Sequence, residues 1–461
     1  MRLRNAIDKC RSLGYMINEL DLQSGLGRRV LLDSELIAQP EELQKALDEI
    51  EQIYNAYDNI KNAELFDNIK IKLAQVRDIK STIANLSQNA TLDDIELFEI
   101  KHLCLTADSI INLLNEGKIE AVKLPDLNDA IAILDPDNTR IPHFYIYDAY
   151  SEELTGLRKK IKAAKEKDGQ ADELYLQSVE VEDSIRTGLS DKLRPYSNDL
   201  ATLLNNLAKL DILIAKASQI SSEKLVKPII TKDKTSYRGL FNPPIKKNLE
   251  NEEKHYQPVD IDIKHSPCLI TGANMSGKTV LLKTIQLAQY LFQLGFYIPA
   301  SQASIYIVDE VIVSIVDEQE EMKGLSSYAA EMLTINDMIN VVKSGKRTLL
   351  LIDELARATN PTEGKAIVSA MLDFLVEHKA GSIITTHYSG IQTNARRLRV
   401  KGFIEEKVSG SLNKSNINDY IDYNLIEDDK DDVPMDAIRV AQLLGVSNEL
   451  LDKAKLYITR E

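Results

Sequence analysis

The stretch that decides the fold runs from Cys268 to Thr279 and reads Cys-Leu-Ile-Thr-Gly-Ala-Asn-Met-Ser-Gly-Lys-Thr. Its first residues are apolar and predict a short buried strand. After the stretch, apolar residues recur at helical spacing until Gly295, at Val280, Leu281, Ile285, Ala288 and Leu291. A strand, a loop with two glycines and a helix are the context that a phosphate-binding P-loop requires. The sequence therefore predicts nucleotide binding at this loop.

The predicted loop offers each kind of contact that a nucleoside triphosphate needs. Its backbone N–H groups and the N-terminus of the following helix can point at phosphates. Lys278 should reach the β- and γ-phosphates, and the Thr279 hydroxyl should join the coordination shell of Mg²⁺. We therefore expect ATP and Mg²⁺ as cofactors and the following nucleotide-binding residues: Gly272, Ala273, Asn274, Met275, Ser276, Gly277, Lys278 and Thr279.

Two later apolar segments end in polar residues. Residues 347–352 are followed by Asp353 and Glu354, and residues 382–386 are followed by His387. At a strand end beside a P-loop, Asp353 can hold the Mg²⁺ shell through water, and Glu354 can polarise the attacking water. His387 can sense the γ-phosphate or orient that water. The alternatives are a strand that merely ends in an acidic turn and a histidine without a role. The P-loop upstream favours a site that hydrolyses ATP.

Composition and charge limit the classes of function. A chain of 461 residues is too long for one core and should split into about two to four domains. It has no apolar run of about 18 residues and no apolar leader, so we expect neither a membrane span nor a signal peptide. Three scattered cysteines indicate a reduced compartment, and we expect a cytoplasmic protein. A net charge of −15 and a pI near 5.1 lower the expectation of nucleic-acid binding without removing it.

The residues before the P-loop have the periodicity of helices. Residues 1–150 should form an all-helical core domain, and residues 151–225 a pair of long lever helices. One lever helix should begin at the N-cap Ser151 and pair with a helix over residues 198–217. Residues 226–408 should form the α/β P-loop domain, followed by a helical segment over residues 409–461. The basic run from Arg158 to Lys167 is either a solvated helix face or a nucleic-acid contact.

Taken together, these motifs resemble the MutS family of ABC-related ATPases. The resemblance rests on the P-loop, on residues 295–300, on the block from Asp353 to Gly364 and on the run Thr385-Thr386-His387-Tyr388. It is strongest over residues 255–400 and extends loosely over nearly the whole chain. It implies an α/β P-loop ATPase domain preceded by a helical core and lever domain.

The resemblance also implies features that spacing alone does not reveal. Residues 324–328, followed by Glu331 and Met332, are similar to a family signature segment in which Ser326 would contact the γ-phosphate held by the other subunit. The active sites would then be composite, and the working unit would be a homodimer or a heterodimer with a related chain. Tyr256 resembles the aromatic residue that stacks on adenine. Residues 436–454 resemble closing helices that pack across the dimer.

Other parts of the sequence depart from the mismatch-repair members of this family. We expect no N-terminal reading domain, because the sequence starts at the helical core, and no DNA clamp, because roughly thirty residues separate the predicted lever helices. Ala356 and Ala358 stand where those members have glycines. Residues 317–319 and 359–364 lean toward the subfamily with a C-terminal Smr nuclease, although we expect no nuclease domain after Glu461. Shortened chains of this shape also resemble the reactivase ATPases that accompany B12-dependent aminomutases.

Two classes of function therefore compete. In the first, a nucleotide-switched dimer remodels a protein client through its lever helices. In the second, a DNA-binding ATPase of mismatch repair or recombination control contacts duplex DNA at the lever tips. The residues for that contact would be Arg158, Lys159, Lys160 and Lys162. The expected lack of DNA-gripping domains favours the protein client. A catalytically dead scaffold is a third interpretation, and the intact pair Asp353 and Glu354 argues against it.

Overall fold

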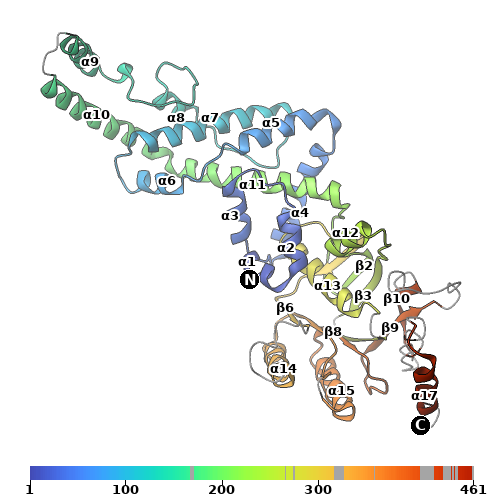
Figure 1. Cartoon of the computed structure of the whole chain (residues 1–461). Coiled ribbons are helices and arrows are strands. Elements are labelled where there is room, and N and C mark those ends of the chain that lie inside the picture. The colour runs from blue at the N-terminus through green and yellow to red at the C-terminus, as the bar shows by residue number, and fades with distance from the viewer. Residues whose placement is uncertain are drawn as a thin grey trace. The chain divides into compact units, whose positions relative to one another are not determined.

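The computed structural model describes residues 1–166, 171–264, 266–273, 276–315, 327–357, 359–404, 420–428, 438, 441 and 445–458. It confirms the predicted fold class, a helical region followed by a mixed α/β region (Figure 1). Within the described ranges, none of the helices is both long and apolar enough to cross a membrane.

The chain forms two compact units. The first, here called the sheet unit, contains Met1–Glu19, Glu35–Leu47 and Ser222–Glu461, and the second, the helical unit, contains Leu20–Ser34 and Asp48–Ser221. Helices α4 (Pro40–Tyr57) and α11 (Ser197–Glu223) carry the chain from one unit into the other. The first helices of the chain thus belong with its C-terminal half, a division that the domain boundaries expected from the sequence do not contain.

The helical unit is built from amphipathic helices with defined caps. The N-cap Asp93 and Glu96 form a reciprocal capping box at the start of α7, and the Ser151 side chain accepts a hydrogen bond from Leu154 N at the start of α9. The helices that this unit contains besides α4 and α11 are α3 (Gly25–Asp33), α5 (Ala63–Leu73), α6 (Lys80–Ser87), α7 (Asp94–Glu116), α8 (Asn128–Leu134), α9 (Glu152–Lys165) and α10 (Asp172–Leu193).

The expected pairing of the lever helices is wrong. Helix α9 packs against α10, alongside which it runs in Figure 1, and not against the helix over residues 198–217. The residues between the two predicted lever helices, expected to be either helical or linking, contain α10, a helix of 22 residues that continues through a short 3₁₀ turn into α11. Arg158 of α9 reinforces the pairing, because its Nη2 donates to Glu182 Oε1 of α10 at 2.9 Å.

A six-stranded sheet forms the centre of the sheet unit. Its strand order is β10-β9-β4-β8-β7-β6, with the β10–β9 pair antiparallel and every other pair parallel. The carboxyl ends of neighbouring parallel strands meet at one edge, where ligands of such sheets bind. These strands are β4 (Pro267–Thr271), β6 (Glu310–Ser314), β7 (Thr348–Ile352), β8 (Gly381–Thr386), β9 (Arg396–Phe403) and β10 (Ile421–Glu427).

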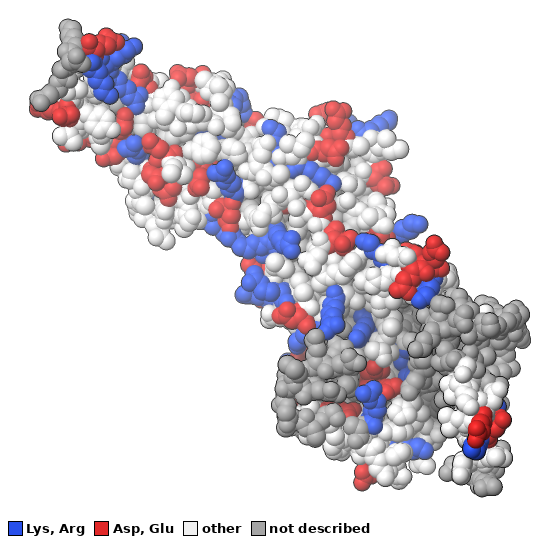
Figure 2. Space-filling model, in the orientation of Figure 1, with Lys and Arg blue, Asp and Glu red and all other residues white. Residues whose placement is uncertain are grey.

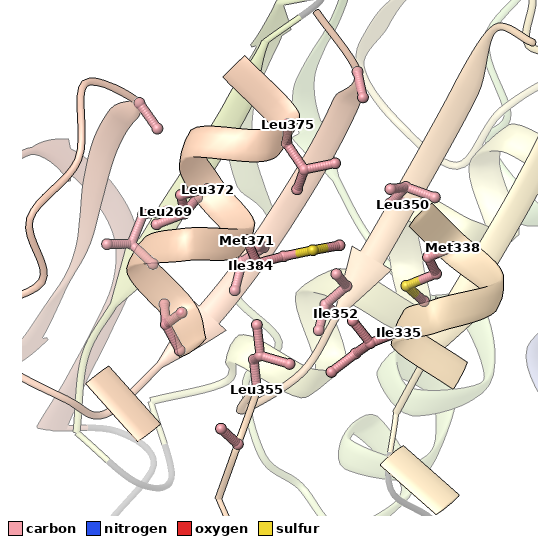
Figure 3. Close-up of a cluster of buried hydrophobic side chains, with 14 of the residues drawn as sticks. Leu269, Ile335, Met338, Leu350, Ile352, Leu355, Met371, Leu372, Leu375 and Ile384 are labelled. Atoms are coloured by element: carbon pink, nitrogen blue, oxygen red, sulfur yellow. The ribbon is translucent and has the colours of Figure 1, made fainter. Parts of the chain in front are cut away.

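Helices cover both faces of this sheet. On one face, α14 (Ser327–Lys343) and α15 (Pro361–Glu377) bury an apolar cluster against β4, β7 and β8, in which Met338, Met371 and Ile384 meet (Figure 3). On the other face lies α13 (Lys278–Gln293), which contacts β6, β7 and β8. Helix α2 (Arg11–Asn18) packs on the outer side of α13, which explains why nearly every position of α13 is buried.

A second, four-stranded sheet flanks the P-loop region with the order β1-β5-β2-β3. Its β1–β5 pair is parallel, and its other two pairs are antiparallel. The other elements that the structure describes in the sheet unit are β1 (Ile229–Thr231), β2 (Lys234–Leu240), β3 (Val259–Lys264), β5 (Gln302–Tyr306), α1 (Leu3–Lys9), α12 (Pro243–Asn251) and α17 (Asn448–Ile458).

Candidate active site

The predicted P-loop connects β4 to α13, as the sequence indicated. Gly277 is the N-cap of α13 and has the left-handed φ of +82°, a conformation that favours glycine. Lys278 is only 4% exposed, and its Nζ donates to the carbonyl oxygens of Gly272 and Ala273 at 2.8 and 3.0 Å. Burial lowers the pKa of Lys278, while Glu354 and Asp353 oppose that shift. The side chain therefore folds back over its own loop, where a phosphate could draw it away.

The predicted metal-binding pair lies at the ends of β7 and the P-loop. Asp353 follows β7, and its Oδ2 accepts a hydrogen bond from Thr279 Oγ1 at 2.6 Å. Both are oxygen donors of the kind that Mg²⁺ prefers, and Mg²⁺ bound to a nucleotide takes its other ligands from phosphates and water. The described residues contain no cluster of three His, Cys, Asp or Glu side chains suited to a metal ion. The pair thus fits Mg²⁺ that arrives with a nucleotide.

A threonine at the end of the neighbouring strand holds both acidic residues. Thr385 of β8 is fully buried, and its Oγ1 donates to Asp353 Oδ1 at 2.6 Å. The same oxygen accepts a hydrogen bond from the backbone N of Glu354 at 3.0 Å. Sequence reasoning missed this role, although Thr385 stands in the run that carried the family resemblance. One hydroxyl therefore fixes both the metal-binding carboxylate and the backbone of the proposed general base.

Glu354 and His387 face each other across the site. Glu354 Oε2 lies 4.0 Å from His387 Nδ1 and 3.6 Å from Nη1 of Arg357. The Nδ1 atom of His387 is buried and has no hydrogen-bond partner among the residues that the structure describes. A buried polar atom without a partner is costly and rare. The ring nitrogen is thus placed to bind a group that enters the site, such as a water molecule or a phosphate oxygen.

The backbone after Glu354 takes an unusual path. Glu354 and Ala356 have left-handed φ angles of +46° and +62°, which residues other than glycine seldom adopt. Ala356 is held on both sides, because its N–H donates to Glu331 Oε1 at 2.7 Å and its carbonyl accepts from Tyr388 Oη at 2.9 Å. Such conformations persist only where the surroundings enforce them, and they cluster at functional sites.

A cavity of about 280 Å³ opens beside the P-loop. Its walls are largely apolar and include Leu240, Val280, Val400 and the rings of Tyr256 and Tyr423. Tyr256 Oη accepts a hydrogen bond from the backbone N of Asn242 at 3.0 Å, which anchors that ring. Sequence reasoning identified Tyr256 and missed Tyr423 on β10. An apolar cavity lined by aromatic rings at a phosphate loop has the chemistry for a nucleobase.

Some predicted residues lie outside the described part of the chain. These are Asn274 and Met275 of the P-loop, Ser326 of the signature segment and Ala358. Of the predicted closing segment over residues 436–454, the structure describes residues 438, 441 and 445–454. Ser276, the remaining residue of the predicted loop, is buried just before α13 and lines the base-sized cavity.

Comparisons with known proteins agree with this geometry. Residues 268–460 match the family model described as MutS domain V. Three similar relatives are each named Endonuclease MutS2. The relative from Lactobacillus helveticus is 36% identical over 205 residues, which are 43% of this chain and 25% of the relative. That from Caldanaerobacter subterraneus subsp. tengcongensis is 31% identical over 295 residues, 63% of this chain and 35% of the relative.

The third relative covers most of the chain. The protein from Fusobacterium nucleatum subsp. nucleatum is 28% identical over 417 residues, which are 89% of this chain and 49% of the relative. The chain thus spans between a quarter and about half of the length of these relatives. MutS domain V is an ATPase domain, so the expected ATPase domain and its resemblance to the MutS family are confirmed, and the domain implies ATP binding.

Proposed function

We propose that this chain binds ATP with Mg²⁺, hydrolyses it, and couples the hydrolysis cycle to an action on duplex DNA. The observation that carries the ATPase part is one hydrogen-bonded chain, in which Thr279 contacts Asp353 and Thr385 contacts both Asp353 and Glu354. These hydrogen bonds bring the ends of the P-loop, β7 and β8 to one point. Phosphoryl transfer needs little covalent chemistry from the protein, so positioning of this kind supplies most of the catalysis.

Each residue has a definite role in the proposed reaction. Lys278 would leave the loop carbonyls and pair with the β- and γ-phosphates, and Thr279 and Asp353 would hold Mg²⁺, whose charge would offset that of the phosphates. Glu354 accepts the proton of the attacking water, and His387, 4.0 Å from Glu354, orients that water or the γ-phosphate. Tyr256 and Tyr423 flank the base. The Lys278→Ala variant should therefore lose nucleotide binding, and Glu354→Gln should bind ATP without turning it over.

The active unit that we propose is a dimer with composite sites. Ser326 lies outside the described residues and directly precedes α14 (Ser327–Lys343) in the sequence. As the resemblance to the signature segment implies, the Ser326 hydroxyl would contact the γ-phosphate held by a second subunit. The exposed apolar side chains of α17, with Leu450, Leu456 and Tyr457 each more than half exposed, support a partner surface at the C-terminus.

Duplex DNA is the effector that the relatives favour, because each of them is named an endonuclease. Remodelling of a protein client, which the sequence favoured, is therefore the second candidate function. The net charge of −15 supports it, and a reactivase of B12-dependent aminomutases would be one protein of this kind. On α9, Lys159, Lys160, Lys162 and Lys165 are exposed, and Figure 2 shows basic side chains gathered at this helix. Arg158 is engaged with Asp148 and Glu182, so it contributes less to any phosphate contact than the lysines.

The decisive experiment measures steady-state ATPase activity of the full chain with and without duplex DNA, at about 50 and 200 mM salt. Stimulation by DNA that weakens steeply with salt is the expected result, since contacts to several phosphates release counterions. Substitution of Lys159, Lys160 and Lys162 by glutamate should abolish the stimulation and leave basal turnover intact. The matched control replaces Lys61, Lys80 and Lys123, three exposed lysines elsewhere in the helical unit, by glutamate.

Three outcomes would contradict parts of the proposal. Basal turnover that DNA does not change at either salt concentration would favour the protein client, which pull-downs with the ATP-bound Glu354→Gln variant could identify. Turnover that persists in Glu354→Gln would show that the activity comes from elsewhere. Normal turnover in Ser326→Ala would contradict the composite site alone.

A further inference from the structure

The two tyrosines of the base-sized cavity are joined by one side-chain amide. Gln257 directly follows Tyr256 in the chain, and its amide reaches across to β10. Gln257 Nε2 donates to Asp422 Oδ1 at 2.9 Å, and Gln257 Oε1 accepts a hydrogen bond from the backbone N of Tyr423 at 3.2 Å. The segment that contains Tyr256 is therefore hydrogen-bonded to the segment of β10 that contains Tyr423.

The hydrogen bonds from Gln257 reach β10 at a β-bulge. In the β10–β9 pair, Asp422 lies opposite Gly402 and Leu425 lies opposite Val400, so Tyr423 and Asn424 together face the single residue Lys401. A bulge releases a backbone group from the ladder and turns a side chain to a new direction. The N–H of Tyr423 is such a group, and Gln257 provides its acceptor.

The bulge directs Tyr423 onto the phosphate loop. A Cβ atom placed on Gly277 would lie 2.8 Å from Cδ1 of Tyr423, closer than such contacts allow. The ring therefore touches the loop backbone at the residue before Lys278 and forms the cavity wall beside the P-loop. Any shift of the bulge moves this ring relative to both Tyr256 and the P-loop.

Asp422 makes the bulge rigid. It is 8% exposed, and its Oδ1 also accepts hydrogen bonds from N and Nδ2 of Asn424 at 3.0 and 2.8 Å. Its Oδ2 forms an ion pair with Lys401 Nζ at 2.8 Å. Gln257 is the link that ties this assembly to Tyr256, since these other partners lie on β9 and β10.

We propose that Gln257 is a positioning residue for the nucleobase, which sets the separation of Tyr256 and Tyr423. This inference rests on the proposed ATP binding. Gln257 acts through the two rings and not through the triphosphate, so it determines affinity for the base and not for the phosphates. A planar aromatic base is the ligand that two rings held at a fixed separation in one cavity select.

The test compares ATP with inorganic tripolyphosphate, which has the phosphates without a base. In the Gln257→Ala variant of the full chain, two hydrogen bonds are lost, and the Kd for ATP should rise about tenfold. The Kd for tripolyphosphate, measured by displacement of a fluorescent ATP analogue, should change less than about twofold. The control variant Gln302→Ala, at an exposed position of β5, should change neither.

A second variant separates positioning from folding. Gln257→Glu keeps the side chain's length but places a second carboxylate against Asp422, so ATP affinity should fall at about pH 8. Combination with Asp422→Asn restores a donor to that contact and should recover most of the affinity. A role in folding alone would lower the affinities for ATP and tripolyphosphate together in Gln257→Glu, whereas a positioning role lowers the affinity for ATP and spares that for tripolyphosphate.

The outcomes distinguish this inference from its premise. Equal loss of ATP and tripolyphosphate affinity in Gln257→Ala, or no loss of either, would overturn the positioning role while leaving ATP binding in place. A wild-type chain that binds tripolyphosphate and ATP equally would show that the cavity holds no base. A wild-type chain that binds neither ligand would refute the proposed function together with the inference.

Discussion

Glu331 of α14 accepts a hydrogen bond from the backbone N of Ala356, with Oε1 and N separated by 2.7 Å. Ala356 comes two residues after Glu354 and has a left-handed φ of +62°. A helix that follows the proposed signature segment therefore holds the turn that carries the proposed general base. Tyr388, next to His387, holds the same alanine from the other side. The turn is thus fixed by two elements that flank the catalytic groups.

Removal of this acceptor should damage both stability and turnover. Glu331→Ala leaves the N–H of Ala356 buried without a partner, which costs about 1–3 kcal/mol of unfolding free energy. The displaced turn should lower ATP turnover by about ten- to a hundredfold, because small misplacements at a catalytic group are costly. Thermal unfolding and steady-state ATPase assays measure the two effects. Unchanged turnover in Glu331→Ala would show that the turn does not depend on this contact.

The isosteric variant Glu331→Gln is the matched control and gives a pH test. Burial raises the pKa of Glu331 above its ordinary value of 4.5, although the bond from Ala356 and the charge of Arg357 oppose the shift. Ionisation therefore costs stability, and the wild type should lose stability as pH rises from 4.5 through the raised pKa. The amide in Glu331→Gln cannot ionise and keeps an acceptor for Ala356 N, so that variant should lack the decline. Parallel profiles of unfolding free energy against pH for both proteins would contradict the argument.

The helical unit contains a buried ion pair whose disruption should be severe. Lys101 and Asp135 have no exposed side-chain surface, and Nζ lies 3.0 Å from Oδ1. Burial alone would raise the pKa of Asp135, but hydrogen bonds from Arg140 N, Lys101 and Thr139 outweigh it and lower that pKa. Asp135→Asn leaves the ammonium group of Lys101 without its counter-charge, and should cost about 3–5 kcal/mol of unfolding free energy.

A double variant and a surface control complete this prediction. Lys101→Met combined with Asp135→Asn removes both charges, so it should be more stable than Asp135→Asn alone. Disruption of the partly exposed pair Arg29 and Asp78 by Arg29→Ala should cost no more than about 1 kcal/mol. Calorimetric unfolding of the full chain measures the unfolding free energy of Asp135→Asn, of the double variant and of Arg29→Ala. If Asp135→Asn lowers the unfolding free energy no more than Arg29→Ala does, the buried ion pair contributes no more to stability than the surface pair.

The parts of the site that could be predicted from sequence are those set by local order along the chain. The strand, loop and helix around Lys278 are contiguous, and Asp353, Glu354 and His387 follow parallel strands whose carboxyl ends must meet. The role of Thr385 could not be predicted, because nothing in the local sequence distinguishes it from any other threonine in a buried strand. Its role depends on β8 lying between β4 and β7, which is a property of strand order and not of local sequence.

Tyr423 and the lever helices show where prediction fails. Tyr423 lies on an edge strand far from the P-loop in sequence, and the bulge that directs it toward Gly277 has no local sequence signal. The pairing of α9 with α10 was missed because the residues between the two predicted lever helices, expected to be either helical or linking, were not considered as the partner of α9. In each case the deciding contact is non-local, and apolar periodicity describes only what one segment does by itself.

The carboxylate at the bulge should make stability depend on acid pH. Burial would raise the pKa of Asp422, but the bonds from Lys401, Gln257 and Asn424 outweigh it and bring the pKa to about 2. With an ordinary value of 3.8, this group contributes about 2 kcal/mol above about pH 4, which is lost as pH falls toward 2. The stability gap between wild type and Asp422→Asn should therefore narrow between about pH 6 and pH 3. A gap that stays constant would show that the charge of Asp422 is not what stabilises the bulge.

The last prediction concerns Thr385, whose hydroxyl serves both acidic residues. Thr385→Val preserves shape and strand preference but removes the donor to Asp353 and the acceptor for Glu354 N. Asp353 is then free to rotate away from Thr279, so half-maximal turnover should require more Mg²⁺, and the maximal rate should fall about ten- to a hundredfold. ATP binding without Mg²⁺ should stay unchanged, because Lys278 and the loop are untouched. Thr385→Ser keeps the hydroxyl and should behave nearly as wild type. An unaltered Mg²⁺ requirement in Thr385→Val would mean that Thr279 alone positions Asp353.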